Sequence, residues 1–185
     1  MFLKDRMIRF FDLVSGLMAL LILSPLILSI FLFLKMYQGD AIFRQERLGR
    51  YEKPFYLLKF RTMKHDTPQG RTSSIGGNYI STPGKFLRAW KLDELPQLVN
   101  IIRGDMGFVG PRPGLVIDQQ LRDLRAANSL FTMRPGLTGV AQLMGVDMST
   151  PKKLVRLDRL HFRHSGICAC FVLCFKTLCF LFIRK

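Results

Sequence analysis

Acidic side chains are scarce in this 185-residue sequence, which has 13 Asp and Glu against 28 Lys and Arg and a formal net charge of +15 at pH 7. A charge of this sign and size indicates anionic partners, such as nucleic acid, phospholipid headgroups or a phosphorylated substrate. The sequence has no RNP-like aromatic motif and no zinc-finger spacing, which are typical of nucleic-acid-binding domains. We therefore expect membrane lipid or a phosphorylated substrate as the partner, and no nucleic acid.

Cysteine is absent from the first 167 residues, and all four cysteines lie near the C-terminus, at Cys168, Cys170, Cys174 and Cys179. None forms a C-x-x-C pair, and the second pair of a usual metal site is missing. The histidines match no recognised metal site with nearby acids; they are His65, His161 and His164. The cysteines are interpreted as small apolar residues of a membrane or core face, which fits a reducing cytosolic location.

Long uncharged runs, by contrast, are present at both ends of the chain. Residues 13–34 (LVSGLMALLILSPLILSIFLFL) carry no formal charge. As an α-helix they would be about 33 Å long, close to the thickness of a hydrocarbon layer. The run is too long for the apolar region of a signal peptide, and no small-residue cleavage site follows it. We therefore expect a retained membrane segment.

Pro25 follows Ser24 near the middle of this run, and it lacks the N–H that would bond to the Leu21 carbonyl. A kink is expected there, and a kinked spanning helix is one interpretation, because neighbouring groups can satisfy the freed carbonyl. A hairpin that returns to the same membrane face is the other. It fits the basic residues on both sides of the run, which are Lys4, Arg6, Arg9, Lys35, Arg44, Arg47 and Arg50.

The C-terminal residues 166–183 (GICACFVLCFKTLCFLFI) are apolar except for Lys176. A lysine in the middle of so short a run is costly inside a bilayer. A helix lying in the membrane interface, with Lys176 and Arg184-Lys185 reaching for headgroups, is therefore expected. A helix packed against the globular core is the alternative.

Between these ends, residues 40–165 are expected to form a soluble part. Residues 41–63 alternate in places between apolar and polar positions, which predicts two short strands joined by a turn. Residues 65–85 are rich in Gly, Ser, Thr and Pro and are expected to form a mobile loop near a site. The fold class is therefore α+β, with domains at 1–39, 40–165 and 166–185.

Two helices are expected after the loop, the first over residues 84–90 (GKFLRAW). In the second, Leu95, Leu98, Val99 and Ile102 follow the spacing of a buried helix face. Pro96 suits its first turn, and Gly104 would terminate it.

Asp93-Glu94 is the one adjacent acidic pair of the sequence, and it lies among basic residues at the start of this second helix. The pair has a structural interpretation, in which Asp93 caps the helix and Glu94 sits in its first turn. In the functional interpretation, Arg88, Lys91 and Arg112 keep Asp93 ionised as a nucleophile or metal ligand. Two carboxylates could also recruit Mg²⁺ together with substrate phosphates. Both interpretations predict the same helix.

Two turn-rich segments follow, GPRPG at 110–114 and RPGLTG at 134–139, and each places an arginine beside proline. An arginine held on a fixed backbone loses little freedom when it grips a phosphate with two donors. Together with the acid pair and the membrane segment, these turns indicate phosphate chemistry at a membrane face.

The chain resembles the small monotopic phosphoglycosyl transferases, the bacterial sugar transferase family that starts glycoconjugate assembly. The matching motifs occur in the family's order and cover nearly the whole chain: SP at 24–25, FRQERLG at 43–49, KFRTM at 59–63, LDELPQL at 92–98, GDMGFVGPRP at 104–113 and RPGLTGVAQ at 134–142.

The resemblance implies a re-entrant membrane helix broken at Ser24-Pro25, with the active site on the cytoplasmic face of the bacterial inner membrane. It implies that Asp93 attacks the sugar-proximal phosphorus of a UDP-sugar, releases UMP and passes the phosphosugar to polyprenyl phosphate. It further implies Mg²⁺ at Asp93 and an essential partner role for Glu94. Phosphate or nucleotide contacts are implied for Lys59, Arg88, Pro111, Arg112 and Pro113.

The sequence departs from the family pattern at three places. Trp90-Lys91 stands where small or hydroxylated residues are frequent, Val146 where many members have arginine, and Cys170 near a frequent aspartate. These departures concern the pocket for the donor sugar, so the sugar is not predicted, and whether the chain forms a homodimer is left open. The rival functions are a membrane-anchored anion-binding scaffold, which would release no nucleotide, and a direct glycosyltransferase, which would release UDP.

Overall fold

The protein is mainly helical, with two small sheets, which confirms the expected α+β class. The computed structural model describes residues 2–64, 67, 79–164 and 167–183. Its helices are α1 (Phe2–Gln38), α2 (Thr82–Ala89), α3 (Gln97–Arg103), α4 (Gln119–Ala127), α5 (Val140–Leu143), α6 (Pro151–His164) and α7 (Ile167–Ile183). Its strands are β1 (Ile42–Leu48), β2 (Pro54–Phe60), β3 (Gly107–Val109), β4 (Gly114–Leu115) and β5 (Gly136–Thr138). Short 3₁₀ turns lie at η1 (Arg50–Glu52), η3 (Leu92–Glu94) and η4 (Leu130–Thr132).

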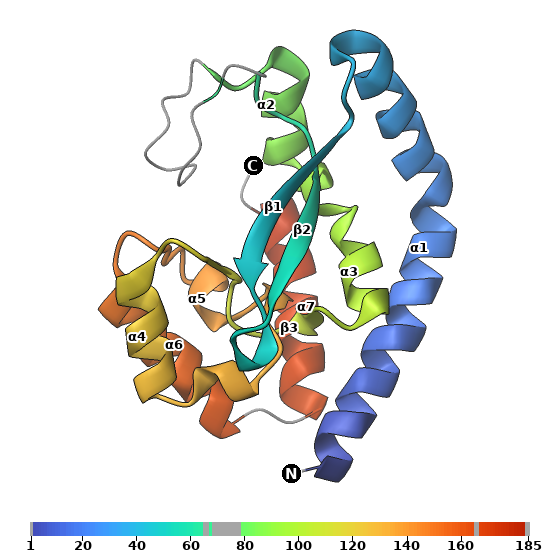
Figure 1. Ribbon diagram of the computed structural model, residues 1–185. Helices are drawn as coiled ribbons and strands as arrows, with labels where there is room; N and C mark the ends of the chain where they lie inside the picture. Colours follow the sequence, from blue (N-terminus) through green and yellow to red (C-terminus); the bar gives the residue numbers. More distant parts are fainter. Residues whose placement is uncertain (1, 65–66, 68–78, 165–166, 184–185) are drawn as a thin grey trace.

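Helix α1 runs along one side of the molecule as a single helix (Figure 1). It continues through Ser24 and Pro25, where the sequence predicted two helices around a break. The Ser24 hydroxyl donates to the Leu21 carbonyl at 2.8 Å, and this carbonyl is the one that Pro25 leaves without an N–H partner. The backbone is thereby satisfied within the helix. The re-entrant path is not confirmed and stays a prediction.

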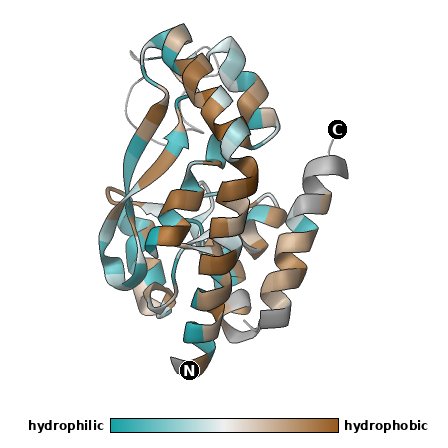
Figure 2. Ribbon diagram, turned by 90° about the vertical axis from the view of Figure 1, so that its right-hand side faces the viewer, coloured by the Kyte–Doolittle hydropathy of each residue, from teal (hydrophilic) through white to brown (hydrophobic). Residues whose placement is uncertain are grey.

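One face of α1 packs on the rest of the protein and the other is open. Ala19, Leu20 and Leu23 contact one core cluster, and Leu34 is fully buried in another. Leu21, Ile22 and other large apolar side chains of the opposite face are exposed, and α1 is predominantly brown in the hydropathy view (Figure 2). By length and composition, residues Leu3–Gln38 could cross a membrane, and only 6% of their most apolar window is buried. By length and composition, this helix is the element of the described chain that could associate with a membrane.

Polar contacts attach the start of α1 to the globular part. The guanidinium of Arg9 donates to the carbonyls of Ile101 and Ile102 at 2.5 and 2.6 Å, at the C-terminal end of α3. The carboxylate of Asp12 accepts from the Phe108 amide at 3.2 Å. Carbonyls at the end of a helix have no partner within it, so Arg9 caps α3.

The predicted pair of strands is confirmed as the antiparallel hairpin β1–β2, whose register runs from Ile42 opposite Phe60 to Leu48 opposite Pro54. Strand β4 adds to the other edge of β1, so the sheet order is β2-β1-β4. Phe55 and Leu57 are buried against α3 and α1 in one core cluster. The end of β1 thus lies beside the segment that follows β3, since Arg47 pairs with Leu115 and donates to the Pro113 carbonyl.

A second, parallel sheet joins β3 and β5 and brings the two turn-rich segments together. The Gly110 amide donates to the Thr138 carbonyl, and the Gly136 amide donates to the Pro111 carbonyl, each at 2.9 Å. A Cβ on Gly136 would lie 2.0 Å from the Gly110 nitrogen, and a Cβ on Gly110 would lie 2.4 Å from the Arg134 oxygen. Only glycine allows these backbones to approach so closely.

We predict that Gly136→Ala lowers the free energy of unfolding by about 1–3 kcal/mol, because the new methyl group must push the two backbones apart. Chemical unfolding in detergent, followed by circular dichroism, measures the change. Gly16→Ala is the control, since its Cβ would meet only Ile101 and Ile102 side-chain atoms at 3.4 Å. Equal stability of the two variants would contradict the close approach.

The C-terminal helix α7 contacts β3, β5 and α5, which agrees with the core-packed alternative on one of its faces. The hydroxyls of Thr138 and Thr177 lie 2.7 Å apart, and the ring of Phe171 contacts that of Phe11 edge-on at 5.6 Å. Val172 and Phe175 are exposed. An interfacial, amphipathic position at the membrane is not confirmed and stays a prediction.

Most of the predicted loop at 65–85 lies outside the described residues. Its described end differs from the prediction, because α2 begins at Thr82. The Ser81 hydroxyl accepts from the Gly84 amide at 3.2 Å, and this N-cap extends the helix backwards from the apolar pattern. The boundaries of the three predicted domains stay predictions.

Candidate active site

The acid pair lies in the turn η3, between α2 and α3. Lys91, just before it, has the left-handed backbone angles φ 57° and ψ 17°, which are uncommon for a residue with a side chain. Pro96 occupies the N-cap position of α3, and neither carboxylate caps that helix. Gly104 ends α3 with φ 92°, as predicted. The structure therefore does not support the interpretation of Asp93 as a helix cap.

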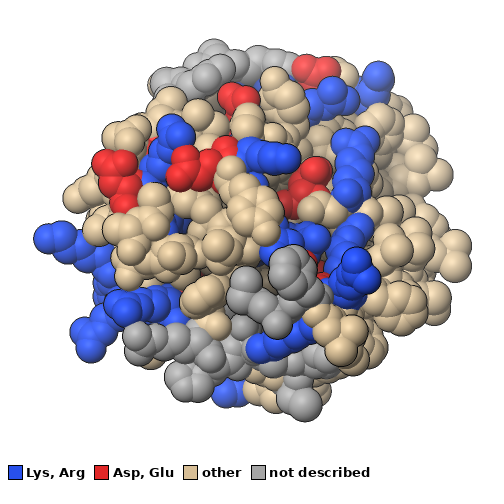
Figure 3. Space-filling model, turned by 60° about the horizontal axis from the view of Figure 1, so that its bottom comes forward, with Lys and Arg blue, Asp and Glu red and all other residues tan. Residues whose placement is uncertain are grey.

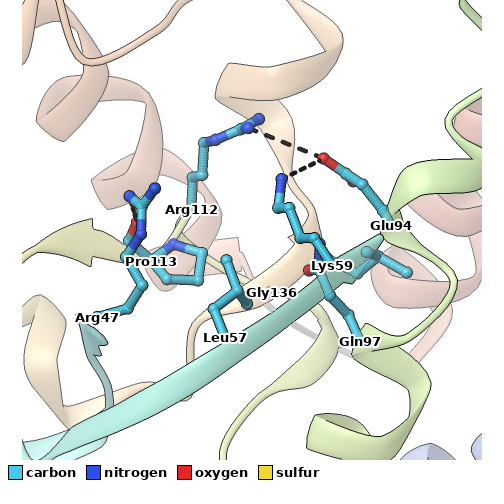
Figure 4. Close-up of a pocket in the computed structure, with 9 residues that line it drawn as sticks. Arg47, Leu57, Lys59, Glu94, Gln97, Arg112, Pro113 and Gly136 are labelled. Carbon is cyan, nitrogen blue, oxygen red and sulfur yellow. Dashed lines mark hydrogen bonds and ion pairs between the residues drawn. The ribbon is translucent and has the colours of Figure 1, made fainter. Parts of the chain in front are cut away.

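This turn helps to line a pocket, together with β1, β2, α3, β5 and the segment between β3 and β4 (Figure 4). The lining residues are Arg47, Leu57, Lys59, Glu94, Gln97, Arg112, Pro113, Gly136 and Leu137. Three of them are cationic and one is anionic. Figure 3 shows basic side chains at several places on one face of the molecule, with most acids next to basic residues. The pocket suits an anionic ligand.

Glu94 is held by two bases of the pocket. Its carboxylate oxygen lies 3.0 Å from Lys59 Nζ and 3.8 Å from a guanidinium nitrogen of Arg112 (Figure 4). Burial by itself raises the pKa of Glu94, but Lys59, Arg112 and Lys91 together lower that pKa to about 2. Glu94 is therefore ionised at every physiological pH.

The surroundings of Asp93 differ from those of Glu94, which is paired with two bases. Asp93 is 7% exposed, and its Oδ1 atom has no hydrogen-bond partner within the described part of the chain. Burial is the largest influence and raises the pKa of Asp93, as does the charge of Glu94. Lys59, Lys91 and Arg88 lower this pKa, and the net shift is upward. Of the three expected bases, Lys91 and Arg88 act on Asp93, Lys59 joins them, and Arg112 pairs with Glu94 instead; burial and the neighbouring Glu94 together outweigh these bases. A buried carboxylate oxygen without a partner is a candidate nucleophile or metal ligand.

Mg²⁺ fits this arrangement through Asp93. Glu94 is already paired with two bases, and no group of three or more His, Cys, Asp or Glu side chains that could hold a metal occurs within the described ranges. Mg²⁺ is usually held by one or two carboxylates together with substrate phosphates. One free carboxylate oxygen beside a cationic pocket is consistent with that kind of site.

The structure brings most of the predicted residues together. Lys59, Glu94, Arg112 and Pro113 line the pocket. Pro111 contributes the carbonyl that accepts from the Gly136 amide.

Asp93 and Arg88 are not among the residues that line the pocket. Arg88 interacts electrostatically with Asp93 and donates through Nε to the Thr62 hydroxyl at 2.8 Å. Ser24 and Pro25 lie in α1.

Arg134 is not in the pocket, although the second turn-rich segment suggested a phosphate contact. Its guanidinium pairs with Asp5 of α1 at 3.0 Å, and Arg50 pairs with the same carboxylate at 2.8 Å. This arginine, just before β5, attaches that segment to α1 and is not among the pocket's lining residues.

Sequence reasoning missed Arg47 and Gln97 as pocket residues, although both lie in motifs that were recognised. Arg47 donates to the Pro113 carbonyl at 3.0 Å and to the Gln45 side-chain oxygen at 2.6 Å. Burial and the nearby Arg112 lower the pKa of Arg47 to about 10. A cation inside the motif FRQERLG was the available signal.

Comparisons with known proteins identify the family of the chain. The profile of a family described as "Bacterial sugar transferase" matches residues 3–184. The chain is 38% identical over 143 residues to a protein of Caulobacter vibrioides named UDP-glucose:undecaprenyl-phosphate glucose-1-phosphate transferase. The match covers 75% of the chain and 54% of that relative. It is 35% identical over 188 residues to the exopolysaccharide production protein ExoY of Rhizobium meliloti, covering 92% of the chain and 83% of ExoY.

A third relative is longer. The chain is 33% identical over 154 residues to the undecaprenyl-phosphate galactose phosphotransferase of Salmonella typhimurium, and the match covers 74% of the chain and 32% of that protein. The chain thus spans about half or less of two of these three relatives.

Proposed function

Because the chain belongs to the bacterial sugar transferase family, we propose that it transfers a phosphosugar from a UDP-sugar to polyprenyl phosphate. Relatives named as sugar-phosphate transferases acting on undecaprenyl phosphate support this reaction. The observation on which the proposal rests is the buried Asp93 oxygen without a partner, beside Glu94, Lys59 and Arg112.

In the first step, a carboxylate oxygen of Asp93 attacks the phosphorus that bears the sugar. A bond forms between Asp93 and that phosphorus, the bond to the bridging oxygen of the diphosphate breaks, and UMP leaves with that oxygen. Asp93 is suited to this role because its Oδ1 is not engaged by any described group. The two carboxylates thereby have different tasks, one reacting and the other orienting.

Lys59, Arg112 and Arg47 supply the positive charge that a diphosphate requires. They lie on three different segments and face one pocket, so they can hold the phosphate oxygens while charge moves to the leaving group. Glu94 orients Lys59 and Arg112, since its pKa is too low for proton transfer near neutral pH. Mg²⁺, when bound at Asp93, would add further charge neutralisation of the phosphates.

In the second step, an oxygen of polyprenyl phosphate attacks the phosphorus held on Asp93. The bond from Asp93 to phosphorus breaks, the carboxylate is regenerated, and a polyprenyl diphosphate-linked sugar is released. One site can then serve a soluble donor first and a membrane-embedded acceptor second. The exposed apolar face of α1 supports a membrane location. We place the site on the cytoplasmic face of the bacterial inner membrane, where nucleotide sugars are available.

The nucleotide product tests the reaction class. Purified protein in detergent, incubated with Mg²⁺, polyprenyl phosphate and a panel of UDP-sugars, is expected to release UMP in equal amount to the lipid product. Release of UDP would indicate direct glycosyl transfer and refute the proposal. A scaffold that only binds anions would release neither nucleotide with any donor.

A further inference from the structure

The segment that carries Arg112 is unusually well fixed. Three successive carbonyls, those of Pro111, Arg112 and Pro113, each accept a hydrogen bond from a different element. The donors are the Gly136 amide of β5, the Arg125 guanidinium of α4 and the Arg47 guanidinium of β1, at 2.9, 2.8 and 3.0 Å. Two prolines restrict the same backbone.

Of the three donors, Arg125 is the one held by a buried ion pair. Arg125 is 4% exposed and pairs with Asp158 of α6 at 2.9 Å, and Asp158 is 3% exposed. One guanidinium thus donates to the Arg112 carbonyl through one nitrogen and to the Asp158 carboxylate through another. Neither Arg125 nor Asp158 lines the pocket.

Stability alone is a weak reason for this ion pair. Apolar residues of similar volume often replace a buried pair without loss of stability, because charges are costly to take out of water. Leu121, Leu154 and Val155 already form an apolar contact between α4 and α6. What apolar residues cannot supply is a fixed donor for the Arg112 carbonyl.

We propose that Arg125, held by Asp158, is a positioning residue that fixes Arg112 in the direction required for the donor diphosphate. The Arg112 side chain is 38% exposed and is 3.8 Å from Glu94, so this one contact holds it loosely within the pocket. Its direction then depends largely on its backbone. This inference rests on the proposed function for the identity of the ligand, but its geometry is independent of it.

The test replaces the ion pair by apolar residues, in Arg125→Met with Asp158→Leu. The variant is expected to unfold near the midpoint of the parent, yet its kcat/KM for the UDP-sugar is expected to fall about tenfold, the scale of one hydrogen bond of about 1.4 kcal/mol. The single variant Arg125→Lys is also expected to have a kcat/KM well below that of the parent, because one ammonium group does not reproduce the guanidinium fork. Arg122→Met is the matched control, since Arg122 lies on the same helix and pairs with Glu52 at 2.7 Å, away from the pocket.

A double-mutant cycle separates positioning from general loosening of the fold. If Arg125 acts through Arg112, the apolar pair should have no further effect in an Arg112→Gln background. Additive losses, or parental kinetics in the folded double variant, would overturn the inference. If the apolar pair does not fold, Arg125→Lys, which keeps a cation beside Asp158 but not the guanidinium fork, is put through the same cycle and decided by the same two criteria.

Binding of inorganic pyrophosphate, measured by calorimetry, makes the two proposals separable. If the unsubstituted protein transfers no phosphosugar, the proposed function is refuted, and the affinity for pyrophosphate alone decides the inference. This affinity is expected to be about tenfold weaker in the apolar double variant and unchanged in Arg122→Met. Unchanged pyrophosphate affinity in the apolar pair would overturn the positioning role even if transfer by the parent is established.

Discussion

Asp93→Asn is expected to abolish phosphosugar transfer, with a loss of at least about 10⁴-fold in kcat, because an amide is a far weaker nucleophile than the carboxylate. The proposal also lets the Asp93 carboxylate hold Mg²⁺, so the substitution weakens both functions. Release of UMP from the preferred donor, measured with excess enzyme, is the assay. Asp105→Asn is the control: its carboxylate accepts from Asn100 at 3.0 Å, outside the pocket lining. Substantial turnover by Asp93→Asn would remove Asp93 from the mechanism.

The same substitution is expected to leave stability unchanged or to increase it at neutral pH. The pKa of Asp93 is raised in the folded protein, so the ionised form is less favourable there than in the unfolded chain. This destabilisation grows as pH rises through the unfolded pKa and reaches its full size above the folded pKa. The midpoint of unfolding of Asp93→Asn minus that of the parent is therefore expected to be larger at pH 7 than at pH 4. An equal difference at both pH values would contradict the raised pKa of Asp93.

Glu94→Gln is expected to reduce kcat/KM by about 10²-fold or more, for a reason unrelated to proton transfer. The neutral amide would release Lys59 and Arg112 from the orientation in which they face the pocket. Lys59→Gln removes the same contact at 3.0 Å and should give a loss of similar size. Lys152→Gln serves as the control, because Lys152 is exposed on α6 and does not line the pocket. A parental kcat/KM in Glu94→Gln would contradict the orienting role.

The pH profile distinguishes orientation from acid–base catalysis by Glu94. Its pKa is depressed to about 2, so the stability that it contributes is present above its unfolded pKa near 4.5 and is lost as pH falls through about 2. Between pH 5 and 9 it should not titrate. A limb of the parent's kcat profile that disappears in Glu94→Gln would show that Glu94 does move a proton.

Local patterns predicted the elements around the site better than the contacts within it. The β1–β2 hairpin and helix α3 followed from alternation and from apolar spacing, and the acid pair stood out against a basic chain. The structural interpretation of Asp93 as a helix cap was wrong because η3 intervenes before α3, and Pro96 takes the N-cap position.

Long-range pairs could not be predicted from spacing. Arg47 bonds to a carbonyl 66 residues away, and Arg125 reaches Asp158 across 33 residues. The residues next to each arginine in the sequence do not indicate which distant group it will contact. The pairing of Arg134 with Asp5 of α1 is a further example, since it withdraws an expected phosphate ligand from the site.

Two departures from the family pattern have structural explanations. Val146 packs against the core formed by α4 and α6, so an apolar residue suits this position here. Lys91 adopts left-handed backbone angles next to the acid pair. Its charge contributes a lowering of the pKa to both carboxylates, although the net shift of Asp93 is upward. Neither residue lines the pocket. A donor sugar therefore has to be identified by experiment.

The intact mass of the protein tests the covalent mechanism most directly. Purified protein is mixed with Mg²⁺ and a panel of UDP-sugars without polyprenyl phosphate. The mechanism predicts an added mass equal to one phosphosugar, an equal amount of UMP, and loss of the adduct when polyprenyl phosphate is supplied. Asp93→Asn should show no adduct. UMP release that depends on polyprenyl phosphate and never produces an adduct would contradict the aspartyl intermediate, as would an adduct that persists in Asp93→Asn.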